Sequence, residues 1–247
     1  MVLRMANEAF THPRLAAIYD ALDPDRGDLE EYVRMAGWLG ARRVVDVGCG
    51  TGVFALLLAG RGGDVVGVDP ARASIDVARA KPGAERVRWI VGDATALPPL
   101  QADLVTMTAN VAQEITDPET WRATLRGAYE ALRPGGHLVF ETRDPSARAW
   151  EGWNREASRS VREVPGGGVV ESWVELVDVS GQLVTFRRNY VFVADGRKLV
   201  STSTLRFRGR EEIEGELGAR GYALREVREA PDRPGRELVF VAQRPSA

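Results

Sequence analysis

Cysteine, histidine and lysine are scarce in this chain, and long apolar runs are absent. The single cysteine, Cys49, excludes an intramolecular disulfide, and we interpret it as a small buried residue rather than a nucleophile. The two histidines and the acidic residues show no metal-ligand spacing, so we expect no metal. No run of about 18 apolar residues occurs, so we expect no membrane-spanning helix.

Charge is nearly balanced: 33 basic and 35 acidic residues give a net charge of −2, which offers no basic footprint for nucleic acid. Residues 143–210 carry 12 basic and 8 acidic residues, whereas residues 1–142 carry 15 and 19. This local excess hints at an acidic substrate, although a solvated surface is the simpler interpretation. The first residues, Met1–Met5, lack the apolar core of a secretion signal, so we expect a cytoplasmic enzyme.

The stretch from Val44 to Leu58 is the most informative part of the sequence. A β-branched run ends in Asp46, glycines follow at positions 48, 50 and 52, and an apolar helix-like run comes next. This pattern predicts a buried strand that turns sharply into a helix, with bare backbone N–H groups at the turn. The spacing departs from the G-x-G-x-x-G of dinucleotide-binding turns, because position 53 is valine. A glycine-rich turn without a ligand is the alternative.

Strand and helix patterns alternate from this point, which predicts parallel strands joined by helical crossovers. The segments are 43–47, 51–60, 64–68, 71–80, 87–91, 103–108, 117–132 and 137–142. Polar residues stand at or just after the predicted strand ends, where such sheets bind ligands; they are Asp46, Asp69, Asp93 and Asn110. Before the first strand, a helix over 7–20 and another that begins with Asp28 as its cap predict a helical lid over residues 1–40.

The pattern changes after residue 143. A polar segment over 145–160 suggests a helix, and runs at 169–179, 183–193 and 198–207, joined by hairpin turns, predict an inserted antiparallel sheet over 165–208. In its middle run Val184, Phe186, Tyr190 and Phe192 share one face, and Thr185, Arg187 and Asn189 share the other. A helix at 211–220 and strands at 222–228 and 237–243 complete one domain over residues 1–247. We expect an α/β fold whose seven-stranded sheet is mostly parallel, with an antiparallel last strand.

The pattern D-x-G-x-G-T-G at 46–52, with Asp69 ending the next strand and Gly92-Asp93-Ala94 after the third, resembles the class I S-adenosylmethionine-dependent methyltransferases over residues 42–142. The resemblance implies a Rossmann-like fold, S-adenosylmethionine as cofactor and S-adenosylhomocysteine as product. The segment Thr108–Val111 departs from the N-P-P-[YF] pattern of enzymes that methylate nucleic-acid bases and glutamine side chains, which disfavours those acceptors. The inserted sheet resembles in layout that of sugar N,N-dimethyltransferases, where it covers the pocket or builds a homodimer contact.

The resemblance also assigns cofactor roles. Asp46 would face the cofactor's ammonium, the three glycines its amino-acid end, Asp69 its ribose hydroxyls, and Asp93 and Ala94 its adenine. The predicted cofactor-binding residues are Asp46, Gly48, Gly50, Gly52, Asp69, Pro70, Asp93, Ala94 and Asn110. The alternative for Asp69 is that it only caps the helix that follows.

Methyl transfer from a sulfonium is an in-line displacement, so positioning matters more than a strong base. Tyr19 and His12 are the candidate catalytic residues, with core packing and a surface position as their alternatives. The candidate substrate-binding residues are Tyr19, Asn110, Gln113, Arg143, Trp150, Trp153 and Arg187. Arg143 could instead pair with Glu141 or Asp144, and the tryptophans could be packing anchors.

The sequence therefore predicts methyl transfer to an oxygen or nitrogen atom of a small molecule, with no nucleic-acid or membrane partner. A nicotinamide-dependent oxidoreductase on a similar sheet is one alternative, and a non-catalytic scaffold that binds S-adenosylmethionine is another.

Overall fold

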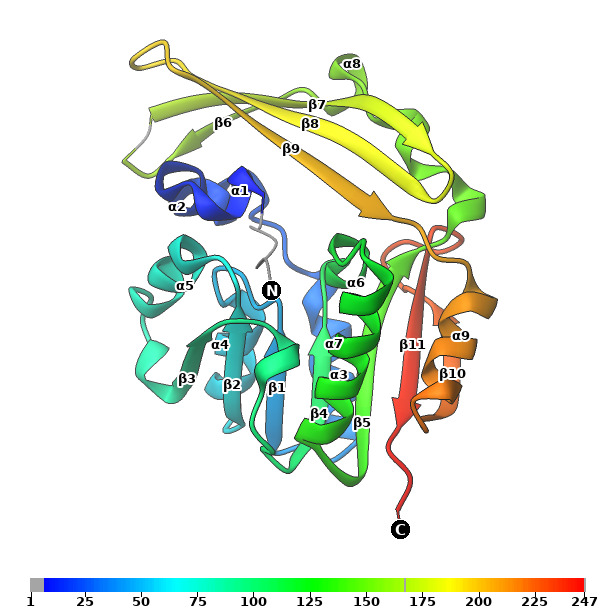
Figure 1. Ribbon diagram of the computed structural model, residues 1–247. Helices are drawn as coiled ribbons and strands as arrows, with labels where there is room; N and C mark the ends of the chain where they lie inside the picture. The colour runs from blue at the N-terminus through cyan, green and yellow to red at the C-terminus, as the bar shows by residue number, and fades with distance from the viewer. Residues whose placement is uncertain (1–6, 167, 247) are drawn as a thin grey trace.

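A computed structural model describes residues 7–166 and 168–246, which build a seven-stranded sheet with a four-stranded sheet above it (Figure 1). The order of the larger sheet is β10-β11-β5-β4-β1-β2-β3. Its strands are β1 (Arg43–Val47), β2 (Asp64–Asp69), β3 (Val87–Val91), β4 (Ala102–Met107), β5 (Leu132–Arg143), β10 (Ala223–Glu229) and β11 (Glu237–Gln243). β1 pairs in parallel with both β2 and β4, so the strand order reverses at this point, and sheets of this kind bind ligands at the carboxyl ends beside such a reversal.

β11 runs antiparallel between β5 and β10, whereas β1 to β5 are mutually parallel. This arrangement confirms the predicted fold class, including the antiparallel last strand.

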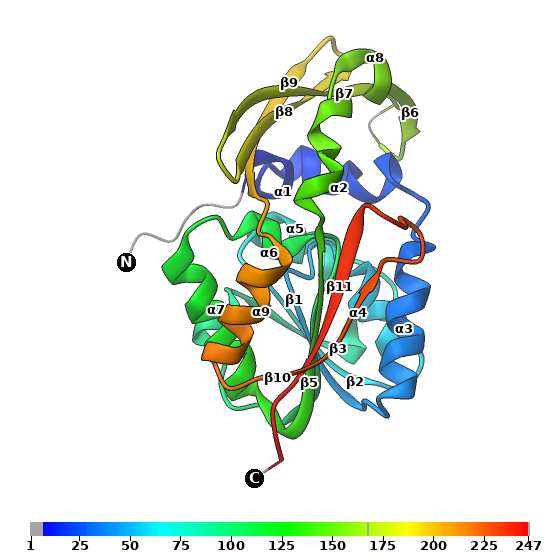
Figure 2. The same cartoon turned by 90° about the vertical axis from the view of Figure 1, so that its right-hand side faces the viewer.

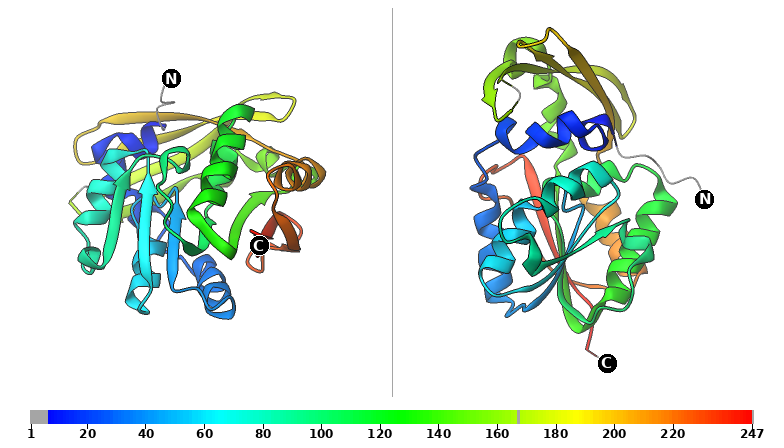
Figure 3. Two further views of the ribbon diagram at one scale, coloured as in Figure 1. Left: turned by 60° about the horizontal axis from the view of Figure 1, so that its bottom comes forward. Right: turned by 90° about the vertical axis from the view of Figure 1, so that its left-hand side faces the viewer.

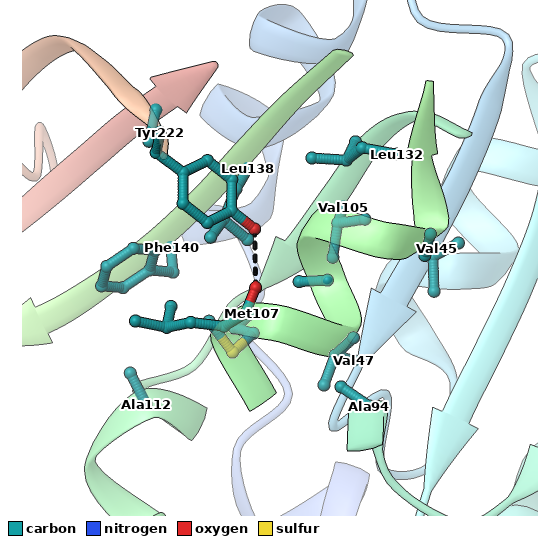
Figure 4. Packing of buried hydrophobic residues seen from close by; sticks show 14 of the residues in the cluster. Val45, Val47, Ala94, Val105, Met107, Ala112, Leu132, Leu138, Phe140 and Tyr222 are labelled. Carbon is teal, nitrogen blue, oxygen red and sulfur yellow. Dashed lines mark hydrogen bonds between the residues drawn. The ribbon is translucent and has the colours of Figure 1, made fainter. Parts of the chain in front are cut away.

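Helices cover both faces of the sheet, as Figures 2 and 3 show. On one face, α7 (Pro118–Ala131) and α9 (Arg210–Ala219) build a core around Trp121, Phe140 and Phe240. On the other, α3 (Asp28–Trp38) and α4 (Val53–Gly60) bury a second cluster. Figure 4 shows part of the first core, where the Tyr222 hydroxyl donates to the Leu125 carbonyl at 2.9 Å. Each large apolar side chain buried in this way contributes about 1.5–3 kcal/mol.

The N-terminal segment forms two helices where we predicted one. α1 (Glu8–Thr11) and α2 (Pro13–Leu22) are separated at His12, whose backbone is extended and whose Nδ1 accepts from the Arg14 N–H at 3.2 Å. Pro13 has no N–H for an intrahelical bond, and it suits the first position of a new helix. The predicted cap of α3 was also wrong: Gly27 is the N-cap, while Asp28 lies in the first turn and pairs with Arg26 at 3.1 Å.

The upper sheet, which we call the lobe, has four strands: β6 (Ser160–Val164), β7 (Gly168–Ser180), β8 (Leu183–Phe192) and β9 (Lys198–Arg206). Sequence analysis predicted the last three and missed β6, because it left residues 161–164 unassigned; its predicted helix at 145–160 is also wrong. The segment instead contains two 3-10 turns and the short α8 (Arg155–Ser158). A turn at Pro165–Gly166 then reverses the chain, so β6 pairs antiparallel with β7.

α1 and α2 lie between the lobe and the carboxyl ends of the main sheet (Figure 1). Leu15 and Ile18 of α2 pack against Val170 and Phe192 of the lobe. The Ala9 N–H donates to Ser201 Oγ at 2.9 Å, which ties α1 to β9. α5 (Arg72–Arg79) and α6 (Val111–Glu114) lie below them. No helix among the described residues is long and apolar enough to cross a membrane.

Candidate functional site

The glycine-rich turn between β1 and α4 uses its three glycines for different purposes. All three have positive φ, between 52° and 80°. A Cβ on Gly48 would lie 2.5 Å from Val111 Cγ2, and one on Gly52 would lie 2.4 Å from Trp89 Cη2. A Cβ on Gly50 would meet nothing within 4 Å. Gly48 and Gly52 therefore permit close packing, whereas Gly50 presents bare backbone to open space.

Two buried carboxylates flank this turn. Asp69 Oδ2 accepts from the Gly50 N–H at 2.9 Å, and its Oδ1 accepts from the Ala71 N–H at 2.8 Å. Asp69 thus fixes the turn and also bonds the N-cap residue of α5, with the exposed Pro70 between them. Asp46 Oδ1 accepts from Thr106 Oγ1 at 3.1 Å, whereas its Oδ2 is buried without a partner among residues 7–166 and 168–246. Burial, with the nearby Asp69 charge, raises the pKa of Asp46 to about 7.

The predicted adenine-binding residues lie at the end of β3. Asp93 is half-buried, and its Oδ1 accepts from both the N–H and the hydroxyl of Thr95. Ala94 is fully buried, and α7 packs so closely that a Cβ on Gly127 would lie 1.9 Å from the Ala94 carbonyl oxygen. The close approach of α7 fixes the position of the backbone after β3.

The lid is tied to the glycine-rich turn by a network that sequence analysis did not find. Asp20 of α2 accepts from Thr51 Oγ1 at 2.5 Å and pairs with Lys81 Nζ at 2.5 Å. Lys81 also donates to the Thr51 carbonyl at 2.7 Å. One of only two lysines in the chain therefore joins the lid to the turn.

The loop after β4 has a strained backbone that two buried carboxylates hold. Ala109 and Asn110 have φ of 56° and 61°, in the left-handed region that residues with a side chain rarely adopt. The Asn110 N–H donates to Glu141 Oε1 at 3.1 Å, and its Nδ2 donates to Glu237 Oε1 at 3.2 Å. The Tyr32 hydroxyl donates to Glu141 Oε2. Burial, with the charge of Glu237, raises the pKa of Glu141 to about 7.

Gln113 and Arg143 join the same group. Arg143 Nη1 donates to Gln113 Oε1 at 2.9 Å, and Arg143 Nε lies 3.6 Å from Glu237 Oε1. Within the described part of the chain, Gln113 Nε2 and Asn110 Oδ1 are buried without a partner. Three predicted substrate residues thus meet around Glu237, which we did not predict. The signal in the sequence was that Glu237 and Glu141 each adjoin an apolar run of a predicted strand, where a charged residue is unexpected.

The two tryptophans pack on the lobe. Trp150 and Trp153 lie with ring centroids 4.6 Å from Phe207 and 4.8 Å from Phe186, respectively. The Arg143 guanidinium lies 5.9 Å from the centroid of Trp153. These contacts support the packing-anchor interpretation for both tryptophans, and they place Trp153 at the edge of the group around Glu237.

Tyr19 is half-buried on α2, 5.5 Å from the ring of Phe10, and burial raises the pKa of its phenol. The charge of Arg188 opposes this rise, and Arg188 lies on the face of β8 that carries Tyr190 and Phe192, which pack against the lid. Arg187 lies on the opposite face, exposed, and lines an open surface hollow with Arg155 and Glu175. The structure therefore does not bring Arg187 to the other candidate substrate residues. Arg188, the next residue, lies on the face of β8 toward the lid instead.

These residues fit the S-adenosylmethionine that the resemblance implies. The unpartnered Asp46 Oδ2 can accept from an ammonium, and the open space at Gly50 admits a ligand against the backbone. The carboxylates at 69 and 93 accept hydrogen bonds only, as ribose hydroxyls and an amino group require.

A family model described as "Methyltransferase domain" matches residues 44–136. Among curated relatives, the cypemycin N-terminal methyltransferase of a Streptomyces species is 33% identical over 147 residues, 59% of each chain. The ubiquinone biosynthesis O-methyltransferase of Acinetobacter baylyi is 34% identical over 113 residues, 43% of this chain and 46% of the relative. The chain thus spans about half the length of the curated relatives it matches.

Solved structures share the fold over nearly the whole chain. Streptomyces venezuelae DesVI superposes with a TM-score of 0.76 at 21% identity, over 94% of this chain and 98% of that one. CalS10 of Micromonospora echinaspora, an amino pentose methyltransferase, gives 0.70 at 24% identity over 92% and 96%.

Proposed function

We propose that this chain, whose residues 44–136 match the methyltransferase-domain family, is an S-adenosylmethionine-dependent methyltransferase that acts on an oxygen or nitrogen atom of a small molecule. The family model and the curated relatives confirm the predicted resemblance, and the solved structures share the fold. The resemblance supports the enzyme class and the cofactor, which are part of the proposal. The small-molecule acceptor is our proposal.

The observation that supports this function most directly is the open backbone at Gly50 between two buried carboxylates. Asp69 is bonded to the Gly50 N–H, and Asp46 has an oxygen without a partner. A structural turn would have no reason to keep an unpartnered buried carboxylate oxygen, because such a group costs about 1–3 kcal/mol or more. A cationic group of a ligand removes that cost.

When bound, S-adenosylmethionine supplies a methyl group already activated by its sulfonium. The chain's contribution is then to bind and orient. Asp46 would hold the ammonium, Asp69 the ribose and Asp93 the adenine, while the strained Ala109–Asn110 loop borders the place where the acceptor meets the methyl. Orientation of this kind can lower a barrier by about 7–11 kcal/mol.

The acceptor atom is proposed as oxygen or nitrogen because relatives of both kinds are similar in sequence to this chain. One is named as an N-terminal methyltransferase and the other as an O-methyltransferase. We place the acceptor between the lid, the lobe and the group around Glu237, where Tyr19, Asn110 and Arg143 lie.

Calorimetric titration with S-adenosylhomocysteine tests the cofactor site. Wild type should bind, and ligand at about 100 times Kd should stabilise the fold by about 2.7 kcal/mol. Asp69→Ala should weaken binding at least tenfold, whereas Asp64→Ala, exposed at the other end of β2, should not. Absence of binding to the wild type would overturn the proposal, and unchanged binding by Asp69→Ala would overturn the assignment of the ribose contact.

We also propose a homodimer that pairs through the outer face of the lobe, where Val161 and Val200 are 50% and 41% exposed. Sedimentation of wild type and of a Val161→Asp, Val200→Asp variant tests this, since the variant should sediment as a monomer. The expected cytoplasmic location and the expected absence of a nucleic-acid partner stay predictions.

A further inference from the structure

Arg188 occupies the middle of the lobe's inner face. It pairs in register with Val174 of β7 and Ser201 of β9, and it alternates along β8 with residues that face solvent. Tyr190 and Phe192 on the same face are buried against the lid. The Arg188 side chain therefore faces the lid and the main sheet, and the residue is half-buried.

A polar strip crosses this inner face between two apolar clusters. At one end, Phe192 packs with Leu15 and Ile18 of α2. At the other, Val184 packs with Leu205, Phe207 and the two tryptophans. Arg188, Ser201 and Ser203 lie between these clusters, and both serines are buried. The strip thus places the half-buried Arg188 beside buried polar side chains and between two apolar clusters, where its guanidinium is partly removed from water.

The guanidinium of Arg188 has no carboxylate partner in the part of the chain that the structure describes, since no ion pair within 4.0 Å includes it. Other arginines near the lid and lobe are paired: Arg14 with Asp195 at 2.6 Å and Arg206 with Glu212 at 2.9 Å. Arg188 instead lies two residues from Tyr190 on the same face of β8, and its charge lowers the pKa of both Tyr190 and Tyr19, against the larger effect of burial. Burial raises the pKa of both Tyr19 and Tyr190, so neither phenol supplies a negative charge to Arg188.

The half-buried Arg188 guanidinium has no carboxylate within 4.0 Å among the described residues, so its charge is not compensated there. Arginine stays charged in proteins, and partial burial removes water that would otherwise solvate it. A carboxylate or phosphate that binds the guanidinium in a bidentate way compensates for the lost hydration with two charge-assisted hydrogen bonds, and a tyrosine hydroxyl can donate a further hydrogen bond to the same anion. The excess of four positive charges over residues 143–210 favours the same class of ligand.

The position of Tyr19 connects this site to the proposed cofactor site. The next residue, Asp20, bonds Thr51 in the glycine-rich turn. Consecutive Cα atoms are about 3.8 Å apart, so Tyr19, whose phenol is influenced by the Arg188 charge, also lies next to the residue that bonds the glycine-rich turn. An anion at Arg188 would therefore belong to a molecule that reaches from the lobe toward the place of methyl transfer.

We infer that Arg188, with the hydroxyls of Tyr19 and Tyr190, binds an anionic group, a carboxylate or a phosphate, on the methyl acceptor. This inference rests on the proposed function, because it concerns the acceptor of that reaction. It also replaces Arg187, the residue selected from sequence, with the residue beside it.

Titration of the full chain, saturated with S-adenosylhomocysteine, with inorganic phosphate and separately with malonate tests the inference. Wild type should bind at least one of the two, and the stronger one identifies phosphate or carboxylate as the group. Arg188→Gln should weaken that binding at least tenfold, and Arg188→Lys should recover part of it, since lysine keeps the charge and loses the fork. Arg187→Gln, one residue away on the outer face, should bind like the wild type.

Equal anion binding by wild type and Arg188→Gln, or none by wild type, would overturn the inference. The affinity for S-adenosylhomocysteine is measured in the same four proteins and keeps the two proposals apart. If wild type fails to bind it, the proposed function fails. If all four bind it equally while anion binding does not depend on Arg188, only the inference fails. Melting temperatures show whether each variant is folded.

Discussion

Replacing Gly50 and Gly52 separately by alanine distinguishes a glycine that faces a ligand from one that packs. Both have positive φ, at 52° and 80°. The added Cβ meets nothing within 4 Å at Gly50, but at Gly52 it would lie 2.4 Å from Trp89 Cη2 and 2.9 Å from Ala78 Cβ. The two variants therefore share the backbone strain and differ in the steric conflict.

The magnitudes follow from these two terms. A left-handed conformation costs a residue with a side chain about 1–2 kcal/mol, so Gly50→Ala should lower the free energy of unfolding by that amount. Gly52→Ala adds overpacking of about 1–3 kcal/mol, which gives about 2–5 kcal/mol in total. In a chain of this size each kcal/mol lowers Tm by roughly 2–4 °C.

Affinity should follow the opposite order. The methyl group on Gly50 would occupy the space where we place the cofactor's amino-acid end, so S-adenosylhomocysteine should bind at least tenfold more weakly, a change of about 1.4 kcal/mol. Folded Gly52→Ala should bind within about threefold of wild type, since its Cβ points into the core; threefold is about 0.7 kcal/mol.

Chemical denaturation and calorimetric titration of the two variants provide both quantities. Wild-type affinity in Gly50→Ala would refute the idea that the cofactor lies against that backbone. A stability loss in Gly52→Ala no larger than in Gly50→Ala would refute the packing argument.

Three further predictions concern the carboxylates and the lid. Because burial raises the pKa of Asp46 to about 7, its ionised form appears only as pH rises through that value. Affinity for S-adenosylhomocysteine should therefore increase by about 30-fold from pH 5.5 to 8 in calorimetry and stay flat in Asp46→Asn. Glu141→Gln should lower Tm, and adding Ala109→Gly should recover up to about 1 kcal/mol by relieving the strained loop; no recovery in thermal denaturation would mean that Glu141 does not hold that loop. Lys81→Met should increase hydrogen exchange in residues 13–22 by up to about fivefold, as expected for a partly exposed ion pair of about 0.2–1 kcal/mol, and unchanged exchange would show that this contact does not hold the lid.

The sequence by itself determined the main sheet, because its signals are local. The run Val44–Val47 is β-branched and ends at glycines that only a sharp turn explains, and Pro118 opens α7 where a first-turn proline suits a helix. The carboxylates at 46, 69 and 93 lie at or just after strand ends, and parallel strands bring those ends to one edge. That edge followed from local patterns, whereas the cofactor followed from the resemblance to a family.

The tertiary structure decided what depends on distant contacts. Alternation along β8 divides its residues between two faces, but only the packing of α2 against the lobe shows that Arg188 faces inward and Arg187 outward. Similarly, Gly50 differs from Gly52 because Ala78 and Trp89, 26 and 37 positions after Gly52 in the chain, fill the space beside Gly52. Glu141 and Glu237 meet at Asn110 because β5 and β11 are neighbours, a pairing between residues nearly 100 positions apart. Local patterns specify an element and its faces, and long-range packing specifies what each face meets.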